Sequence, residues 1–228
     1  MNTNVNLAAP IGVFAFLGTG LVIAVAGAFL IYSLVVRRFG RAKIVALALL
    51  IIGGLYLSAI LIFALASSEK VLARGSEKHF CEVDCHLAYS IVDLKQMKTI
   101  GNASNQVTAN GSFTAVSIKT RFDETTISST RGNALLYPNS RVLTMVDDQG
   151  RKYSPSSQAQ KALELAGGAG TPLPTPLRPG ESYTTIVAFD LPADARNPTL
   201  LINEGEWVTH LVIGHENSPL HKKTRFQL

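Results

Sequence analysis

The chain has 228 residues, 47% of them hydrophobic, and its mean hydropathy of +0.23 is high for a water-soluble protein. Its 21 Lys and Arg exceed its 16 Asp and Glu, but four of the basic residues fall within residues 37–43. The remainder is nearly neutral, which argues against nucleic-acid binding, because that function needs a basic domain.

Two uncharged apolar runs, residues 11–36 and 44–66, lie on either side of this basic stretch. Each exceeds the ~20 apolar residues that cross ~30 Å of hydrocarbon, so each predicts a transmembrane helix. The stretch between them contains Arg37, Arg38, Arg41 and Lys43. A short loop rich in Arg and Lys stays in the cytoplasm. We therefore expect an integral protein of the bacterial inner membrane, with residues 1–10 as an extracytoplasmic tail and the C-terminal domain in the periplasm.

The first apolar run is interpreted as a permanent helix. Residues 1–36 lack the basic n-region that begins a signal peptide. Small residues occur in both runs, at Gly18–Gly20, Gly27, Gly53–Gly54 and Ser58. Such residues let transmembrane helices approach closely. Either the two helices pack on each other through them, or they form a docking face for another membrane subunit.

After a polar linker at residues 67–80, the pattern of residues 81–228 predicts one extracytoplasmic β-domain. Alternating or apolar runs bounded by turn residues predict strands at 87–94, 113–122, 141–146, 151–154, 181–191, 199–202 and 207–213. Residues 147–150 are a hairpin turn. A capping box at Ser157–Gln160 opens one short helix, which Gly167 and Gly168 end. Short strands with such turns are typical of an antiparallel β-sandwich.

The stretches "VDDQGRKY" and "LRPGESYTTIVAFDLP", at Asp147–Tyr153 and Leu177–Pro192, carry a resemblance. Their order, with an Asp-Gly hairpin before a Pro-Gly turn and a strand ending in Phe-Asp-x-Pro, resembles the telokin-like, immunoglobulin-like domains found outside bacterial membranes. The resemblance covers about residues 88–213. It implies an immunoglobulin-like sandwich with a binding or structural role.

The two cysteines of the chain, Cys81 and Cys85, lie four residues apart, with His79 before them and His86 directly after. The other histidines are His210, His215 and His221. If the first and last strands of the sandwich are neighbours, the two histidine clusters meet.

Three interpretations of the cysteines remain open. The first is a disulfide, since paired cysteines usually bridge on the oxidising side of a membrane. The second is a copper or zinc site formed by Cys81, Cys85, His86 and His215, since thiolates and imidazoles suit these metals. The third is covalent haem, although Cys-x-x-Cys-His has one residue fewer between its cysteines.

A helical hairpin before a β-domain also loosely resembles cytochrome oxidase subunit II. The dicopper motif of that family, Cys-x-Glu-x-Cys-x-x-x-His-x-x-Met, has the cysteine spacing of this chain. Here the acidic residue is displaced to Glu82, while Tyr89 and Val92 occupy the histidine and methionine positions.

No catalytic Ser-His-Asp order, paired-carboxylate motif or phosphate-binding loop stands out. We expect a non-enzymatic accessory subunit without a cofactor, which presents its β-domain to other membrane or periplasmic proteins. The alternative is a membrane-tethered redox or metal-binding protein that uses Cys81, Cys85 and His86.

Overall fold

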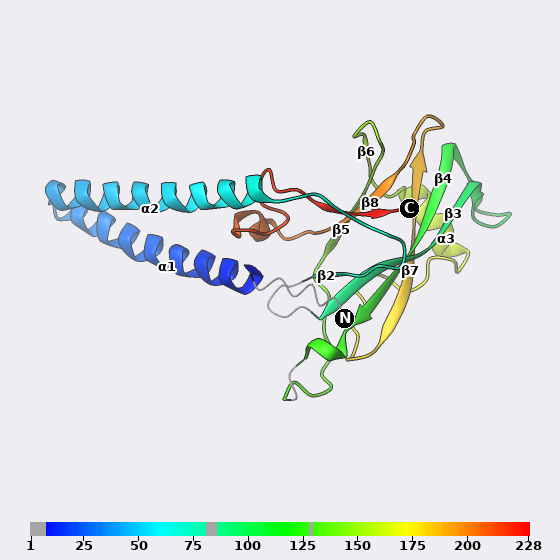
Figure 1. Ribbon diagram of the computed structural model, residues 1–228, viewed down its shortest axis with the longest axis horizontal. Coiled ribbons are helices and arrows are strands. Elements are labelled where there is room, and N and C mark those ends of the chain that lie inside the picture. Colours follow the sequence, from blue (N-terminus) through cyan, green and yellow to red (C-terminus); the bar gives the residue numbers. More distant parts are fainter. Residues whose placement is uncertain (1–7, 81–85, 128–129) are drawn as a thin grey trace. The chain divides into compact units, whose positions relative to one another are not determined.

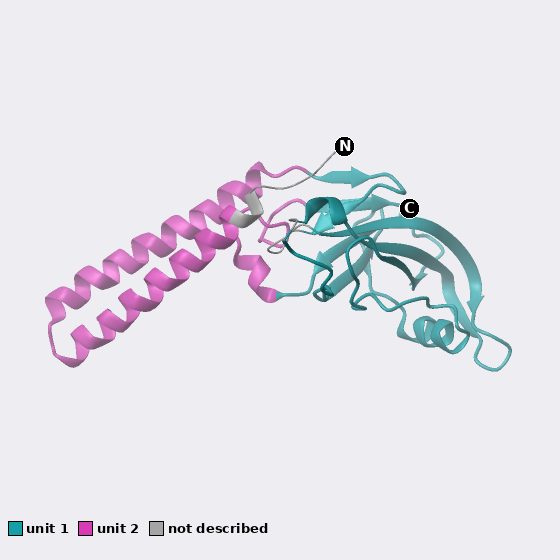
Figure 2. Cartoon of the chain, turned by 90° about the horizontal axis from the view of Figure 1, so that it is seen from below, with its two compact units in different colours: residues 1–5, 69–206, 223–228 teal, residues 6–68, 207–222 magenta. Residues whose placement is uncertain are grey.

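The computed structural model describes residues 8–80, 86–127 and 130–228, and the chain forms two compact units (Figure 2). The helical unit comprises Asn6–Ser68 and Trp207–Lys222. The β unit contains Glu69–Glu206 and Lys223–Leu228. The chain therefore leaves the helical unit, folds most of the β unit, returns, and then completes the β unit.

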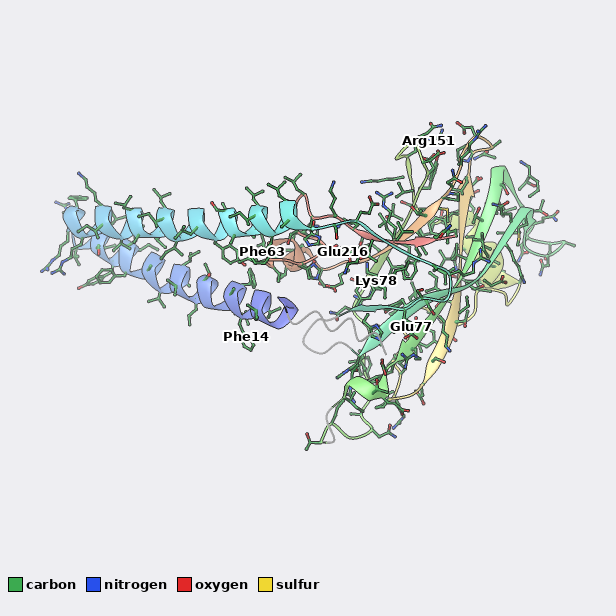
Figure 3. The ribbon with its side chains drawn as sticks, viewed as in Figure 1. Phe14, Phe63, Glu77, Lys78, Arg151 and Glu216 are labelled. Atoms are coloured by element: carbon green, nitrogen blue, oxygen red, sulfur yellow. The ribbon has the colours of Figure 1, made fainter. Side chains whose placement is uncertain are left out.

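Two helices of 28 residues each, α1 (Ala8–Val35) and α2 (Phe39–Ala66), dominate the helical unit (Figure 1). By length and composition, both are apolar enough to cross a membrane. Their large side chains are mostly exposed, as at Phe14 (Figure 3). The turn between the helices spans only residues 36–38, so Arg41 and Lys43 belong to the start of α2.

The glycines of the two helices do not hold the helices together. At Gly18, Gly20, Gly27, Gly53 and Gly54, no atom outside the glycine's own helix lies within 4 Å of where a Cβ would stand. The buried helix residues with described side chains are Gly12, Ser33, Ala42, Ile60 and Ala64. The expectation that these glycines pack α1 on α2 is therefore wrong, and they open outward instead.

The β unit consists of two sheets. Its strands are β1 (Lys70–Leu72), β2 (Lys78–Phe80), β3 (Leu87–Ile100), β4 (Val107–Phe122), β5 (Arg141–Val146), β6 (Lys152–Tyr153), β7 (Ser182–Leu191), β8 (Thr199–Glu204) and β9 (Thr224–Gln227). One sheet has the order β1-β9-β8-β5-β6 and the other the order β2-β3-β4-β7. β1 and β9 pair in parallel and the other described pairs are antiparallel. The expected mainly antiparallel β-domain is confirmed.

Both sheets contribute to one main core. The largest fully buried side chains include Tyr89, Phe122 and Phe189 from the second sheet, and Met145 and Phe226 from the first. In β7, alternate residues point into this core, because successive side chains of a strand point to opposite faces. The sandwich-like arrangement therefore follows from the alternation in the sequence.

The short helix α3 (Ser157–Leu165) covers a second, smaller core. Ala159 and Ala162 pack with Phe113 and Ala188 of β4 and β7. The hydroxyl of Ser156, and not that of Ser157 as expected, accepts the bond from the Ala159 backbone N–H. At the other end, the N–H groups of Gly167 and Gly168 reach back to the carbonyls of Glu164 and Leu163, in a Schellman pattern.

Three further expectations about elements were wrong. Residues 207–213 are not a strand, because 207–211 form the 3-10 helix η2 (Trp207–Leu211). The last strand of the chain is β9, which was not predicted. Residues 67–80 are not merely a linker, since they contain β1 and β2.

Candidate functional site around the cysteine segment

A row of side chains crosses three strands beside the segment that contains the cysteines. His79 of β2 is the register partner of Ala88 in β3, and Ala88 is the partner of Arg121 in β4. Residues opposite one another on neighbouring strands share a face of the sheet. Ala88 is small and buried, so the longer side chains on either side of it converge above it.

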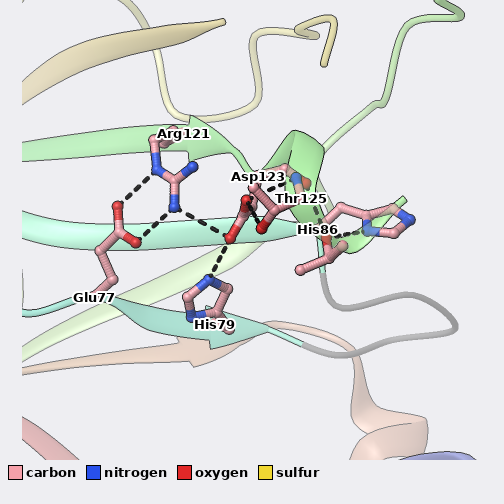
Figure 4. A network of polar contacts seen from close by, with 7 residues as sticks. Glu77, His79, His86, Arg121, Asp123 and Thr125 are labelled. Carbon is pink, nitrogen blue, oxygen red and sulfur yellow. Dashed lines mark hydrogen bonds and ion pairs between the residues drawn. The ribbon is translucent and has the colours of Figure 1, made fainter. Parts of the chain in front are cut away.

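Arg121 is the cationic centre of this network (Figure 4). Its Nε and Nη2 donate to the two carboxylate oxygens of Glu77, each at 2.7 Å. The same Nη2 lies 3.2 Å from Oδ2 of Asp123. Such two-pronged arginine–carboxylate pairs fix geometry as well as charge. Arg121 thereby connects the residue before β2 with the end of β4.

Asp123 is the most buried carboxylate of the network, with 10% of its side chain exposed. Its Oδ1 accepts bonds from the backbone N–H and the hydroxyl of Thr125, at 3.0 and 2.7 Å. Its Oδ2 lies 3.2 Å from Nε2 of His79. Because a carboxylate accepts, this nitrogen of the His79 ring carries a proton. The Thr125 bond also caps the short 3-10 helix η1 (Glu124–Thr126).

His86 fixes the other end of the cysteine segment. Its ring stacks on Phe122 at 5.6 Å between centroids, and its Nδ1 lies 2.6 Å from Oγ1 of Thr126. The Thr126 hydroxyl donates to the Asp123 carbonyl, so Thr126 is the acceptor for His86 and the proton lies on Nδ1. The backbone N–H of Asp123 in turn donates to the His86 carbonyl at 2.7 Å.

The network holds its carboxylates ionised. Burial alone raises the pKa of Asp123, but hydrogen bonds from Thr125 and Arg121 outweigh it and leave the pKa well below its usual value. The bond from Arg121 lowers the pKa of Glu77. The bond to Glu77 raises the pKa of Arg121. The ionised carboxylates can therefore brace the start of β2 against the end of β4 and orient the His79 ring.

The structure places the predicted site residues in different parts of the molecule. Cys81 and Cys85 lie outside the described residues. His86 belongs to the β unit and His215 to the helical unit. The argument for a joint histidine cluster fails, because it assumed that residues 207–213 are the last strand. Within residues 8–80, 86–127 and 130–228, no group of three His, Cys, Asp or Glu is arranged to hold a metal ion.

Sequence reasoning missed Glu77, Arg121, Asp123 and Thr125. Arg121 lies in the strand predicted at residues 113–122, and Glu77 in the predicted linker at residues 67–80. The pattern Asp123-x-Thr125 after a strand is a signal for a local side-chain cap. The meeting of these groups depends on the β2-β3-β4 register, which no local pattern reveals.

No family model matches this chain, and no curated protein matches it. Three solved structures share some similarity with it. A secreted protein from Mycobacterium tuberculosis, MPT63, is 13% identical, with 72% of this chain and 100% of that chain covered and a TM-score of 0.45. A conserved hypothetical protein from Bacillus anthracis is 14% identical, with 57% of this chain and 89% of that chain covered and a TM-score of 0.42. The yjhA protein from Bacillus subtilis is 11% identical, with 68% of this chain and 98% of that chain covered and a TM-score of 0.41. At these scores the likenesses carry no argument about family or function.

Proposed function

We propose that this protein is a non-enzymatic accessory subunit of a membrane assembly. A hairpin of α1 and α2 anchors it in the bacterial inner membrane, and the β unit, of the telokin-like, immunoglobulin-like type, is presented on the periplasmic side. The observation that carries the proposal is the outward-open glycines of both helices. Two sheets with a common core support the immunoglobulin-like assignment.

The exposed apolar surface supports the anchor. Side chains such as Phe14, Leu50 and Leu65 are more than 70% exposed in the described structure. Lipid removes such a surface from water at no cost in hydrogen bonding, because each helix satisfies its own backbone. Arg37, Arg38, Arg41 and Lys43 gather at the turn, which favours a cytoplasmic turn and an extracytoplasmic β unit.

The glycines support the role as a subunit. Within the membrane, helices associate through small residues that allow close contact between backbones. Gly53 and Gly54 are adjacent in α2 and have open space where a Cβ would stand. This surface accommodates a transmembrane helix of another protein, whereas a helix that only faces lipid gains nothing from glycine.

The test is a pair of variants in the full-length protein, purified in mild detergent. In a Gly53→Leu, Gly54→Leu variant, we expect normal membrane insertion but loss of the co-purifying membrane subunit. Ala48→Leu adds a single leucine side chain at an exposed position of the same helix and should keep the subunit. Retention of every co-purifying protein by the glycine variant would contradict the proposal.

A second candidate function is copper or zinc binding by a redox protein. It is favoured by the position of His79 and His86 on either side of the cysteine segment, with one ring nitrogen of each bonded to Asp123 and Thr126. Metal-binding histidines are oriented in this way. Metal analysis of gently solubilised protein tests it, and near-stoichiometric copper or zinc that His86→Ala abolishes would favour it over the accessory role.

A further inference from the structure

Residues 207–222, here called the C-terminal segment, pack on the two helices within the helical unit (Figure 2). The hydroxyl of Tyr56 in α2 donates to the carbonyl of Leu211 at 2.7 Å. A Cβ on Gly12 of α1 would lie only 2.5 Å from the carbonyl oxygen of Ile213. The backbone of the C-terminal segment therefore contacts both helices.

The depth of these contacts follows from helix geometry. Counted from Ile44, about 20 residues of α2 cross the hydrocarbon and reach about Phe63. Tyr56 lies seven residues before Phe63, or about 10 Å along the axis. Gly214 lies beside Phe63, since a Cβ on Gly214 would stand 3.8 Å from its ring. The segment returns to the end of α2, where the N–H of Lys222 donates to the hydroxyl of Ser67 at 2.8 Å.

Several polar groups of the segment are hydrogen-bonded within the protein, as a non-aqueous environment requires. Irregular backbone is tolerated at membrane depth only where its polar groups are satisfied by protein. The hydroxyl of Ser218 donates to the Val212 carbonyl at 2.6 Å, and the amide of Asn217 to the hydroxyl of Thr209 at 2.9 Å. Both Asn217 and Ser218 are buried. The Tyr56 phenol and the Leu211 carbonyl satisfy each other.

Two large apolar side chains are exposed on the segment, with the exposed His210 between them in the sequence. Trp207 is 69% exposed and Leu211 37% exposed. Tryptophan concentrates at the boundary between hydrocarbon and headgroups, where its ring meets lipid and its N–H meets water. We propose that residues 207–214 form a re-entrant segment, which enters the outer leaflet between the ends of α1 and α2 and binds lipid through Trp207 and Leu211. This inference rests on the proposed membrane anchor.

Trp207 is the single tryptophan of the chain, so its fluorescence reports on this segment alone. The full-length protein is reconstituted into phosphatidylcholine vesicles, with or without lipids brominated on their acyl chains. We expect a blue-shifted emission, a large loss of intensity with brominated lipids, and little loss with aqueous iodide. Emission like that of free tryptophan, quenched by iodide and not by brominated lipids, would overturn the inference.

Two variants test how the C-terminal segment packs against α1. Gly12→Leu places a side chain against the Ile213 carbonyl and should shift the Trp207 emission and change its quenching. Gly20→Leu, at a position with open space, should leave both unchanged. A wild-type spectrum in Gly12→Leu would overturn the re-entrant placement.

Alkaline extraction of the same vesicles separates the two proposals. Protein that stays in the membrane but shows a water-exposed Trp207 overturns only the re-entrant segment. Protein released from the membrane overturns the anchor and the segment with it.

Discussion

At the scale of single residues, a small side chain makes the charged network possible. Ala88 stands between His79 and Arg121 in the register of three strands, and a larger residue there would separate them. The hydrogen-bonding partners of Asp123 come from residues up to 44 positions away. The types of these residues were visible in the sequence, but their meeting depended on strand register.

Removing the Asp123 carboxylate should destabilise the β unit. Asp123→Ala removes the acceptor of the Thr125 N–H and of the His79 ring, and one of the two carboxylates paired with Arg121. We expect a loss of about 3 kcal/mol in the free energy of unfolding. Urea unfolding of the detergent-solubilised protein, followed by circular dichroism, measures this loss. Asp148→Ala removes an exposed carboxylate and should change the free energy by less than about 0.5 kcal/mol. Equal effects of the two variants would refute the role of the network.

The same network should make the β unit sensitive to acid. The pKa of Asp123 is lower in the folded state than its unfolded value of about 3.9. Its contribution to stability is therefore full above about pH 4 and is lost as the pH falls toward the folded pKa. The urea midpoint should fall in this acidic range, and fall less steeply in Asp123→Ala. An identical acid dependence in the variant would show that other groups cause it.

At the scale of elements, side-chain alternation and turn residues predicted the strands whose bounds depend on their own local sequence. The strand at residues 141–146 has its expected bounds, and the strand at 181–191 differs from β7 by one residue. Residues 207–213 are apolar enough for a strand, but they belong to the helical unit and begin with the 3-10 helix η2. β9 was missed because only one of its residues, Phe226, is fully buried.

The start of α3 provides a sharp test of capping. Because the Ser156 hydroxyl accepts the Ala159 N–H, Ser156→Ala should lower the free energy of unfolding by about 1 kcal/mol. Ser157→Ala, one residue later and inside the helix, should cost almost nothing, since alanine is the better helix former. The two variants are compared by urea unfolding, and a larger loss at Ser157 would show that the cap is assigned to the wrong residue.

The segment between β2 and β3 contains both cysteines, and the prediction of a disulfide remains open to test. If Cys81 and Cys85 are bridged, the loop is short and the expected stabilisation is only about 2 kcal/mol. A Cys81→Ser, Cys85→Ser variant should lose this amount relative to the oxidised protein and match the reduced one. Two reactive thiols in protein isolated under oxidising conditions would argue against the disulfide.

At the scale of the whole molecule, the order of the units along the chain is the feature that sequence could not show. The apolar runs were evident from composition, and the basic turn predicted their orientation. The return of residues 207–222 to the helical unit was hidden, because the segment is neither long nor apolar enough to resemble a membrane span. β1 and β9 follow the two exits from the helical unit and pair in parallel.

The orientation of the anchor tests the account most directly. One epitope tag is inserted between Arg38 and Phe39 and another is added after Leu228, and spheroplasts are treated with protease before and after lysis. We predict that the C-terminal tag is lost from intact spheroplasts, whereas the tag in the turn is protected until the membrane is opened. Loss of the turn tag with protection of the C-terminal tag, or protection of both tags, would contradict a periplasmic β unit on a two-helix anchor.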